Sequence, residues 1–150
     1  MKSKLYKVTT LCDDRIINLL KNCDQNLTAR WALDAAMHVL YLFEEKNSKD
    51  QRPRQALHAL KLWMDGKISM ADARTYALDS HHAAKNETDP GAIAAARACG
   101  HACAVAHVKT HANGVMMYAI LASMYANGGD QSPETDWQYN HLIELMNVKS

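Results

Sequence analysis

Residues 89–127 read DPGAIAAARACGHACAVAHVKTHANGVMMYAILASMYAN, and this stretch decides the fold of the chain. Asp89 can accept hydrogen bonds from the free amides of a first helical turn, and Pro90 suits the first helical position. Alanine dominates the residues after Pro90, so neighbouring helices can approach closely on several sides. We therefore predict a central Ala-rich helix, which would be about 37 residues or roughly 55 Å long if unbroken. Gly114, within His111-Ala-Asn-Gly, marks its weakest point and predicts a kink there.

Five further helices are predicted on either side of this stretch. Apolar residues at helical spacing, separated by polar or glycine-containing loops, place them at about 10–22, 28–46, 52–64, 70–86 and 133–146. Thr9 and Thr10 are expected to cap the first, Thr28 to open the second, and Ser69 with Asp72 to form a capping box before the fourth. We predict an all-α, single-domain bundle of about six helices over residues 1–150.

Composition and charge narrow the function classes. The hydrophobic share is 48% and the charged share 22%, as in ordinary globular proteins, and the net charge of +1 argues against a general nucleic-acid binder. No run approaches 18 apolar residues without a charge or a histidine, so we expect no membrane contact. The start, MKSKLYK, lacks the apolar segment of a secretory signal, and the four cysteines are expected as reduced thiols. We therefore expect a cytoplasmic protein.

Histidines and cysteines in the Ala-rich stretch raise the question of a metal site. Cys99, Cys103, His107 and His111 are four apart and would form one row on an unbroken helix. Its ends would be about 18 Å apart, too far to share one ion. His107 with His111 is the sharpest metal-binding pair, and Asp34 with His38 is the comparable pair elsewhere. The alternative is that the cysteines pack and the histidines bond across helices. Both interpretations stay open.

Signals for catalysis are weak. No histidine has a nucleophile recognisable from the sequence beside it, and the motifs GxxxxGK[ST] and GxGxxG are absent. A two-metal nuclease needs several converging acids, and the Ala-rich stretch supplies none after its first residue. We predict no catalytic residues and no cofactor, and we favour a binding protein over an enzyme.

Four segments, at 30–44, 50–57, 63–74 and 95–119, carry a family resemblance that spans roughly residues 30–126. Its most specific parts are Gly100-His101 and Ala106-His107-Val108. The chain resembles the immunity proteins of bacterial polymorphic toxin systems, in the small all-helical immunity-5-like group. The resemblance implies a cytoplasmic helical domain that neutralises a cognate toxin by binding it, and it brings no established catalytic residues.

Some members of this group carry an exonuclease label. A DNA-associated or exonuclease-like protein is therefore one alternative function. A metal-binding bundle or metalloenzyme using His107 and His111, which the spacing of these two histidines suggests, is another. Immunity proteins against basic nucleases are often strongly acidic, whereas this chain is nearly neutral, which leaves the class of toxin open. We also consider a homodimer formed through the Met and Tyr side chains at 116–125.

Polar positions within the matching segments are the candidate site residues, either as toxin contacts or as a buried polar network that fixes helix register. They are Arg30, Asp34, Arg52, Arg54, Arg74, Arg97, His101, His107 and His111.

Overall fold

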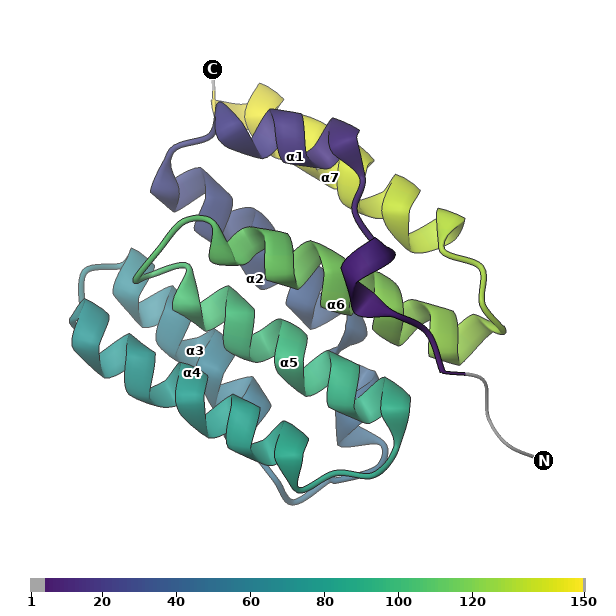
Figure 1. Ribbon diagram of the computed structural model, residues 1–150. Coiled ribbons are helices and arrows are strands. Elements are labelled where there is room, and N and C mark those ends of the chain that lie inside the picture. The colour runs from purple at the N-terminus through teal and green to yellow at the C-terminus, as the bar shows by residue number, and fades with distance from the viewer. Residues whose placement is uncertain (1–4, 150) are drawn as a thin grey trace.

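Helices make up the regular structure of the computed structural model, which describes residues 5–149 (Figure 1). In chain order they are the 3₁₀ turn η1 (Val8–Thr10), α1 (Asp14–Lys21), α2 (Gln25–Glu44), α3 (Arg52–Met64), α4 (Met70–Lys85), α5 (Pro90–Ala104), α6 (His111–Asn127) and α7 (Ser132–Lys149). No strand occurs in these residues, so the predicted all-α fold is confirmed. None of these helices is long and apolar enough to span a bilayer.

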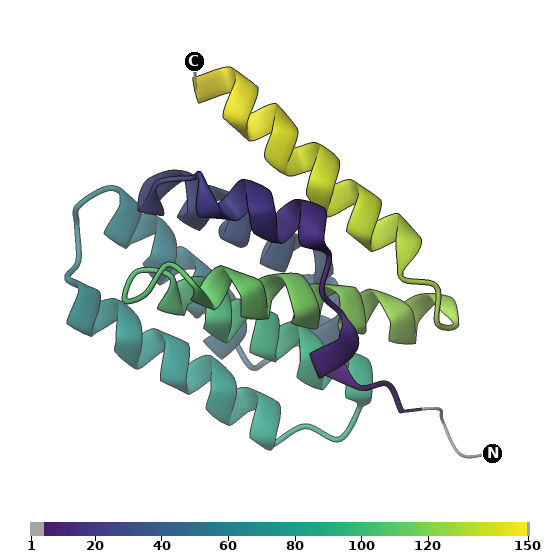
Figure 2. The same ribbon diagram turned by 45° about the horizontal axis from the view of Figure 1, so that its top comes forward.

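Helix α5 is the centre of the bundle, packing against α2, α3, α4 and α6. Ten of its residues are buried, and most of these are alanines. Because an alanine side chain ends at Cβ, four helices can approach one backbone closely. The predicted central position of the Ala-rich stretch is therefore confirmed. Figure 2 shows α7 crossing the outside of this bundle, where it contacts α1, α2 and α6.

The Ala-rich stretch is two helices rather than one rod, which corrects the prediction of an unbroken or merely kinked helix. The chain reverses at 105–110, before the predicted kink, and α6 returns antiparallel to α5 (Figure 1). The side-chain amide of Gln25 donates to the carbonyl oxygens of Val105 (2.8 Å) and Ala106 (3.2 Å), and Lys109 Nζ donates to the Cys23 carbonyl (2.6 Å). The Gln25 bonds satisfy carbonyls that follow the end of α5, and the Lys109 bond ties the reversal to the segment before α2.

Size favours the reversal as well. A 150-residue domain has a radius of gyration of about 15 Å, so a helix of roughly 55 Å would protrude from it. Folding α6 back buries the apolar side chains of both halves instead.

Aspartates open the first two helices, where threonines were predicted. Asp13 accepts from the backbone amides of Arg15 and Ile16 to begin α1, and Asp24 accepts from the Leu27 amide to begin α2. A carboxylate is favoured here by the partial positive charge of a helix N-terminus. The predicted capping box of Ser69 before α4 is confirmed.

Candidate binding face

The outward side of α2 carries a row of exposed or half-buried side chains at helical spacing: Arg30, Asp34, Met37 and Tyr41. Met37 is 44% exposed and Tyr41 50%, although both are large and apolar. We call this row, with the bordering sides of α3 and α7, the binding face. Methionine, aromatic residues and arginine are the types enriched in protein interfaces.

On the α7 border, Trp137 lies between two imidazoles. Its ring stacks on His38 with centroids 3.8 Å apart and on His141 at 4.9 Å. His141 Nε2 lies 2.7 Å from Asp34 Oδ2, and Arg30 lies 3.7 Å from the other oxygen of Asp34. The stack fixes α7 against α2 through an aromatic contact and a hydrogen bond at once.

Beneath this stack lies a buried carboxylate, Glu134, which is 3% exposed. Burial raises its pKa. Its oxygens lie 2.8 Å from His38 Nδ1 and accept from Gln138 Nε2 at 3.0 Å. The indole N–H of Trp31 donates to the backbone carbonyl of Gln138 (3.1 Å). A buried carboxylate needs such partners to offset its desolvation, so this group holds α7 in one register.

On the α3 border, a groove of about 570 Å³ separates α2 from α3. Leu33 and Leu57 are buried at its floor, and Met37 lies at its edge. Its remaining lining is polar: Arg30, Asp34, Gln51, Arg54, Gln55, His58 and Lys61. Both Arg54 nitrogens that face Glu44 donate to it at 2.7 Å, which lowers the pKa of that carboxyl.

A second cluster surrounds the Gly100-His101 motif, at the joint of α4, α5 and α6. The His101 ring stacks on Tyr118 (5.3 Å between centroids), meets His81 edge-on (5.0 Å) and lies 5.6 Å from His111. Arg97 donates to His81 Nδ1 at 2.9 Å. Burial lowers the pKa of both His81 and His101 to about 4, so both rings are neutral near pH 7.

The two glycines of this joint make room for its rings. A Cβ on Gly100 would lie 2.7–2.9 Å from the His81 ring, and one on Gly114 would lie 2.6–3.0 Å from the His101 ring. The structure thus brings Arg97, His101 and His111 together in a packed joint, in which the buried Nδ1 of His101 has no hydrogen-bond partner among the described residues.

The proposed metal ligands do not converge. Asp34 and His38 face α7, His111 lies beside His101, and exposed His107 has Nδ1 3.3 Å from Met70 Sδ. The predicted row on a single helix is broken because the chain reverses after α5. Over residues 5–149, no group of three or more His, Cys, Asp or Glu is placed to hold a metal ion.

The other predicted arginines are dispersed. Arg52 pairs with Asp50 at 2.8 Å at the start of α3. Arg74 is exposed on α4, and no carboxylate of the described chain lies within 4 Å of it. In the segment proposed for a homodimer, Met116 and Met124 are buried, whereas Met117, Tyr118 and Tyr125 are partly buried.

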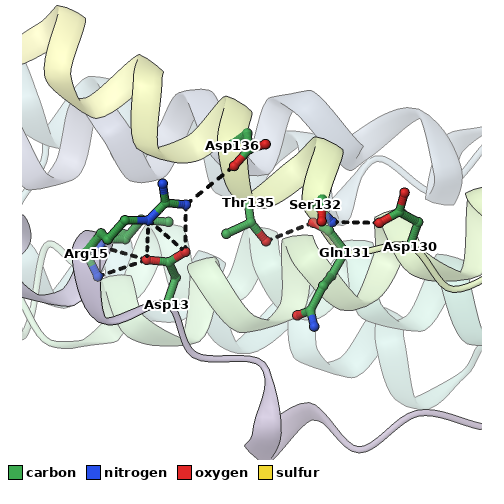
Figure 3. A network of polar contacts seen from close by, with 8 residues as sticks. Asp13, Arg15, Asp130, Gln131, Ser132, Thr135 and Asp136 are labelled. Atoms are coloured by element: carbon green, nitrogen blue, oxygen red, sulfur yellow. Dashed lines mark hydrogen bonds and ion pairs between the residues drawn. The ribbon is translucent and has the colours of Figure 1, made fainter.

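In its first turns α7 is also tied to the start of α1 (Figure 3). Arg15 Nη2 lies 3.0 Å from Asp13 and 3.4 Å from Asp136, and the two carboxylates come from different helices. Asp130 accepts from the Ser132 amide at 3.0 Å. These contacts anchor the first turns of α7, and so hold Trp137 in place above α2.

The fold and this surface define an all-α protein with an exposed aromatic and charged face. The chain matches the family of Imm-5 like putative immunity proteins over residues 18–145, which is most of its length, and it belongs to that family. The match includes α2, α3 and α7 as far as residue 145. Neither the curated proteins nor the solved structures compared with it match the chain.

Sequence reasoning missed the contribution of α7. Glu134, Trp137, Gln138 and His141 lie beyond the segments that carried the resemblance. Their spacing of three and four residues around a tryptophan places them on one side of a helix. That spacing could have predicted that these four side chains share one face of a helix, but it does not show that this face packs against α2.

Proposed function

We propose that this protein is an immunity protein that neutralises a cognate toxin by binding it, without catalysing a reaction. Family membership supports an immunity role, and the observation that carries the binding mode is the exposure of Met37 and Tyr41 beside the Trp137 stack. Solvated large apolar side chains on a rigid helix bury well against a partner. We place the encounter with the toxin in the cytoplasm.

The state of the two thiols in α5 argues against cysteine chemistry in that helix. Cys99 and Cys103 are fully buried, and burial raises the pKa of both thiols, that of Cys103 to about 12. Cys103 Sγ donates to the Ala73 carbonyl at 3.0 Å. A cysteine nucleophile needs the thiolate and access to solvent, and these two side chains have neither.

The histidines that have carboxylate partners serve the α2–α7 contact. Asp34 and Glu134 each approach one imidazole, and both imidazoles stack on Trp137. A general base needs its free nitrogen directed at a bound substrate, and the groove is lined by Asp34 but by neither His38 nor His141. The arrangement therefore supports a rigid contact surface.

We expect the neighbouring reading frame to encode a protein with a toxic C-terminal domain, and the test is co-expression of the chain with that domain. We expect the chain to restore growth and to co-elute with an inactive form of that domain in size-exclusion chromatography. Met37→Glu with Tyr41→Glu should abolish both effects. The matched control is Leu78→Glu, which changes an equally exposed apolar residue on α4 and should retain both. A wild-type chain that neither protects nor co-elutes would refute the proposal.

A further inference from the structure

We infer that the groove between α2 and α3 receives a toxin segment that bears a carboxylate beside an apolar side chain. The inference rests on the proposed function and specifies the chemistry of the partner. It is drawn from the floor, the charge and the solvent-exposed polar side chains of the groove.

The floor accounts for the apolar part of the partner. Leu33 and Leu57 close the groove from below, and Met37 stands half-exposed at its edge. The volume of about 570 Å³ lies within the range of sites that enclose a ligand or several side chains. An apolar side chain entering here would displace water from three hydrophobic surfaces at once.

The charge of the groove is the reason for expecting a carboxylate on the partner. Arg30, Arg54 and Lys61 line the groove, whereas Asp34 is the only carboxylate among its lining residues. Asp34 lies 2.7 Å from His141 and 3.7 Å from Arg30, and Glu44 pairs with Arg54 from outside the lining. Among the described residues this leaves Lys61 as the lining cation without an ion pair. The remaining field is positive, so an anionic group is the complementary ligand.

The α3 side of the groove carries polar side chains that can donate hydrogen bonds to a partner. Gln55, His58 and Lys61 are exposed, spaced three apart on one side of the helix. Within residues 5–149 none of these three side chains has a hydrogen bond or ion pair, so they can meet carboxylate or main-chain oxygens without breaking an existing contact.

A competing surface lies on α4, where Met70 and Leu78 are exposed beside Arg74. Its hollow of about 360 Å³ is lined by a single cation, Arg74, together with His107. It shares the apolar character of the groove but lacks the α3 donors. The groove is therefore the better fit for an acidic partner, and Arg74 supplies the control.

The experiment measures the affinity of the full chain for the inactive toxic domain of the neighbouring reading frame, at low and high salt. For Lys61→Glu we expect binding weaker by about tenfold or more, because a rim cation becomes a like charge opposite the carboxylate. Lys61→Gln should cost less, and binding should weaken as salt rises. Arg74→Glu should change the affinity less than twofold. All three variants alter exposed positions, so the fold should be kept.

Each outcome decides the inference. Full affinity in Lys61→Glu, or a loss confined to Arg74→Glu, would overturn it while leaving the proposed function intact. If the wild-type chain binds no toxic domain, the proposed function fails. The groove can then be tested separately, by NMR titration of the chain with a blocked hexapeptide of alternating leucine and glutamate. Shifts in α2 and α3 with this peptide, but not with its leucine–lysine counterpart, would support the groove. Equal shifts, or none, would refute it.

Discussion

Placing a methyl group on Gly114 tests the joint between α5 and α6. In Gly114→Ala the new Cβ would lie 2.6 Å from His101 Cγ and Nδ1, closer than carbon and nitrogen atoms approach in folded proteins. Those atoms are at the root of the imidazole, so rotating the ring cannot clear them. Tyr118 stacks on the ring and His81 meets its edge, and both block a sideways shift. The two helices must therefore move apart.

Two opposing terms set the size of the effect. Replacing glycine by alanine inside a helix gains about 1 kcal/mol of helix propensity. Overpacking a core that cannot relax costs about 1–3 kcal/mol. With the ring enclosed we expect the upper part of that range, and hence a net loss of about 1–2 kcal/mol in the free energy of unfolding. For a chain of this size the melting temperature should fall by roughly 2–8 °C.

Urea and thermal unfolding of the full chain provide the measurement. Gly91→Ala is the matched control, because a Cβ there meets its neighbours at 3.5 Å, an ordinary contact, and should leave stability unchanged or slightly raised. The double variant with His101→Ala should show a favourable coupling energy, since it removes the obstacle. If Gly114→Ala proves as stable as Gly91→Ala, the enclosed joint is not as described.

Three further predictions concern pH, α7 and the thiols. Burial holds the pKa of His81 and His101 at about 4, below the ordinary 6.5, so between these pH values the unfolded chain binds more protons than the folded one. The free energy of unfolding should therefore be full above about pH 6.5 and fall toward pH 4. The urea midpoints at pH 7 and pH 5 should differ less in a His81→Gln, His101→Gln variant than in the wild-type chain. Trp137→Ala removes two ring stacks and should cost about 1–3 kcal/mol in urea unfolding, whereas Trp137→Phe should recover part of it. In the native protein Cys12 should react rapidly with a thiol reagent while the three buried cysteines stay protected until urea is added, so rapid reaction of two or more thiols would contradict the packing.

Much of the fold was predictable because its signals are local. Apolar spacing and the Arg-Pro start placed α3 within its observed bounds, and Ser69 with Asp72 located the start of α4. These features depend on neighbours within one helical turn. The same holds for the Ala-rich centre, whose small side chains favour close packing whichever way the chain runs.

The reversal at 105–110 could not be predicted in this way. The segment Val-Ala-His-Val-Lys-Thr contains no glycine or proline and is compatible with a continuous helix. Its turn is held by Gln25 and by the Cys23 carbonyl, some 80 residues earlier in the chain. The Asp34–His141 contact spans 107 residues and escaped prediction for the same reason. The sequence of a helix shows which of its faces is apolar, but its spacing of residues does not show which distant helix that face contacts.

The same distinction between packing residues and surface residues indicates which part of the chain would determine the choice of toxin. The motif most specific to the resemblance, Gly100-His101, lies in a joint whose glycines admit neutral, enclosed rings, so it determines how α4, α5 and α6 pack. The residues that face solvent on α2 and α3 are under no such constraint, because Lys61 or Tyr41 can be changed without opening the core. Under the proposed function, the joint can therefore be kept while the binding face is varied to fit a different toxin. Exchanging the outward residues of α2 and α3 between two members should transfer toxin recognition, whereas exchanging the joint should alter stability alone.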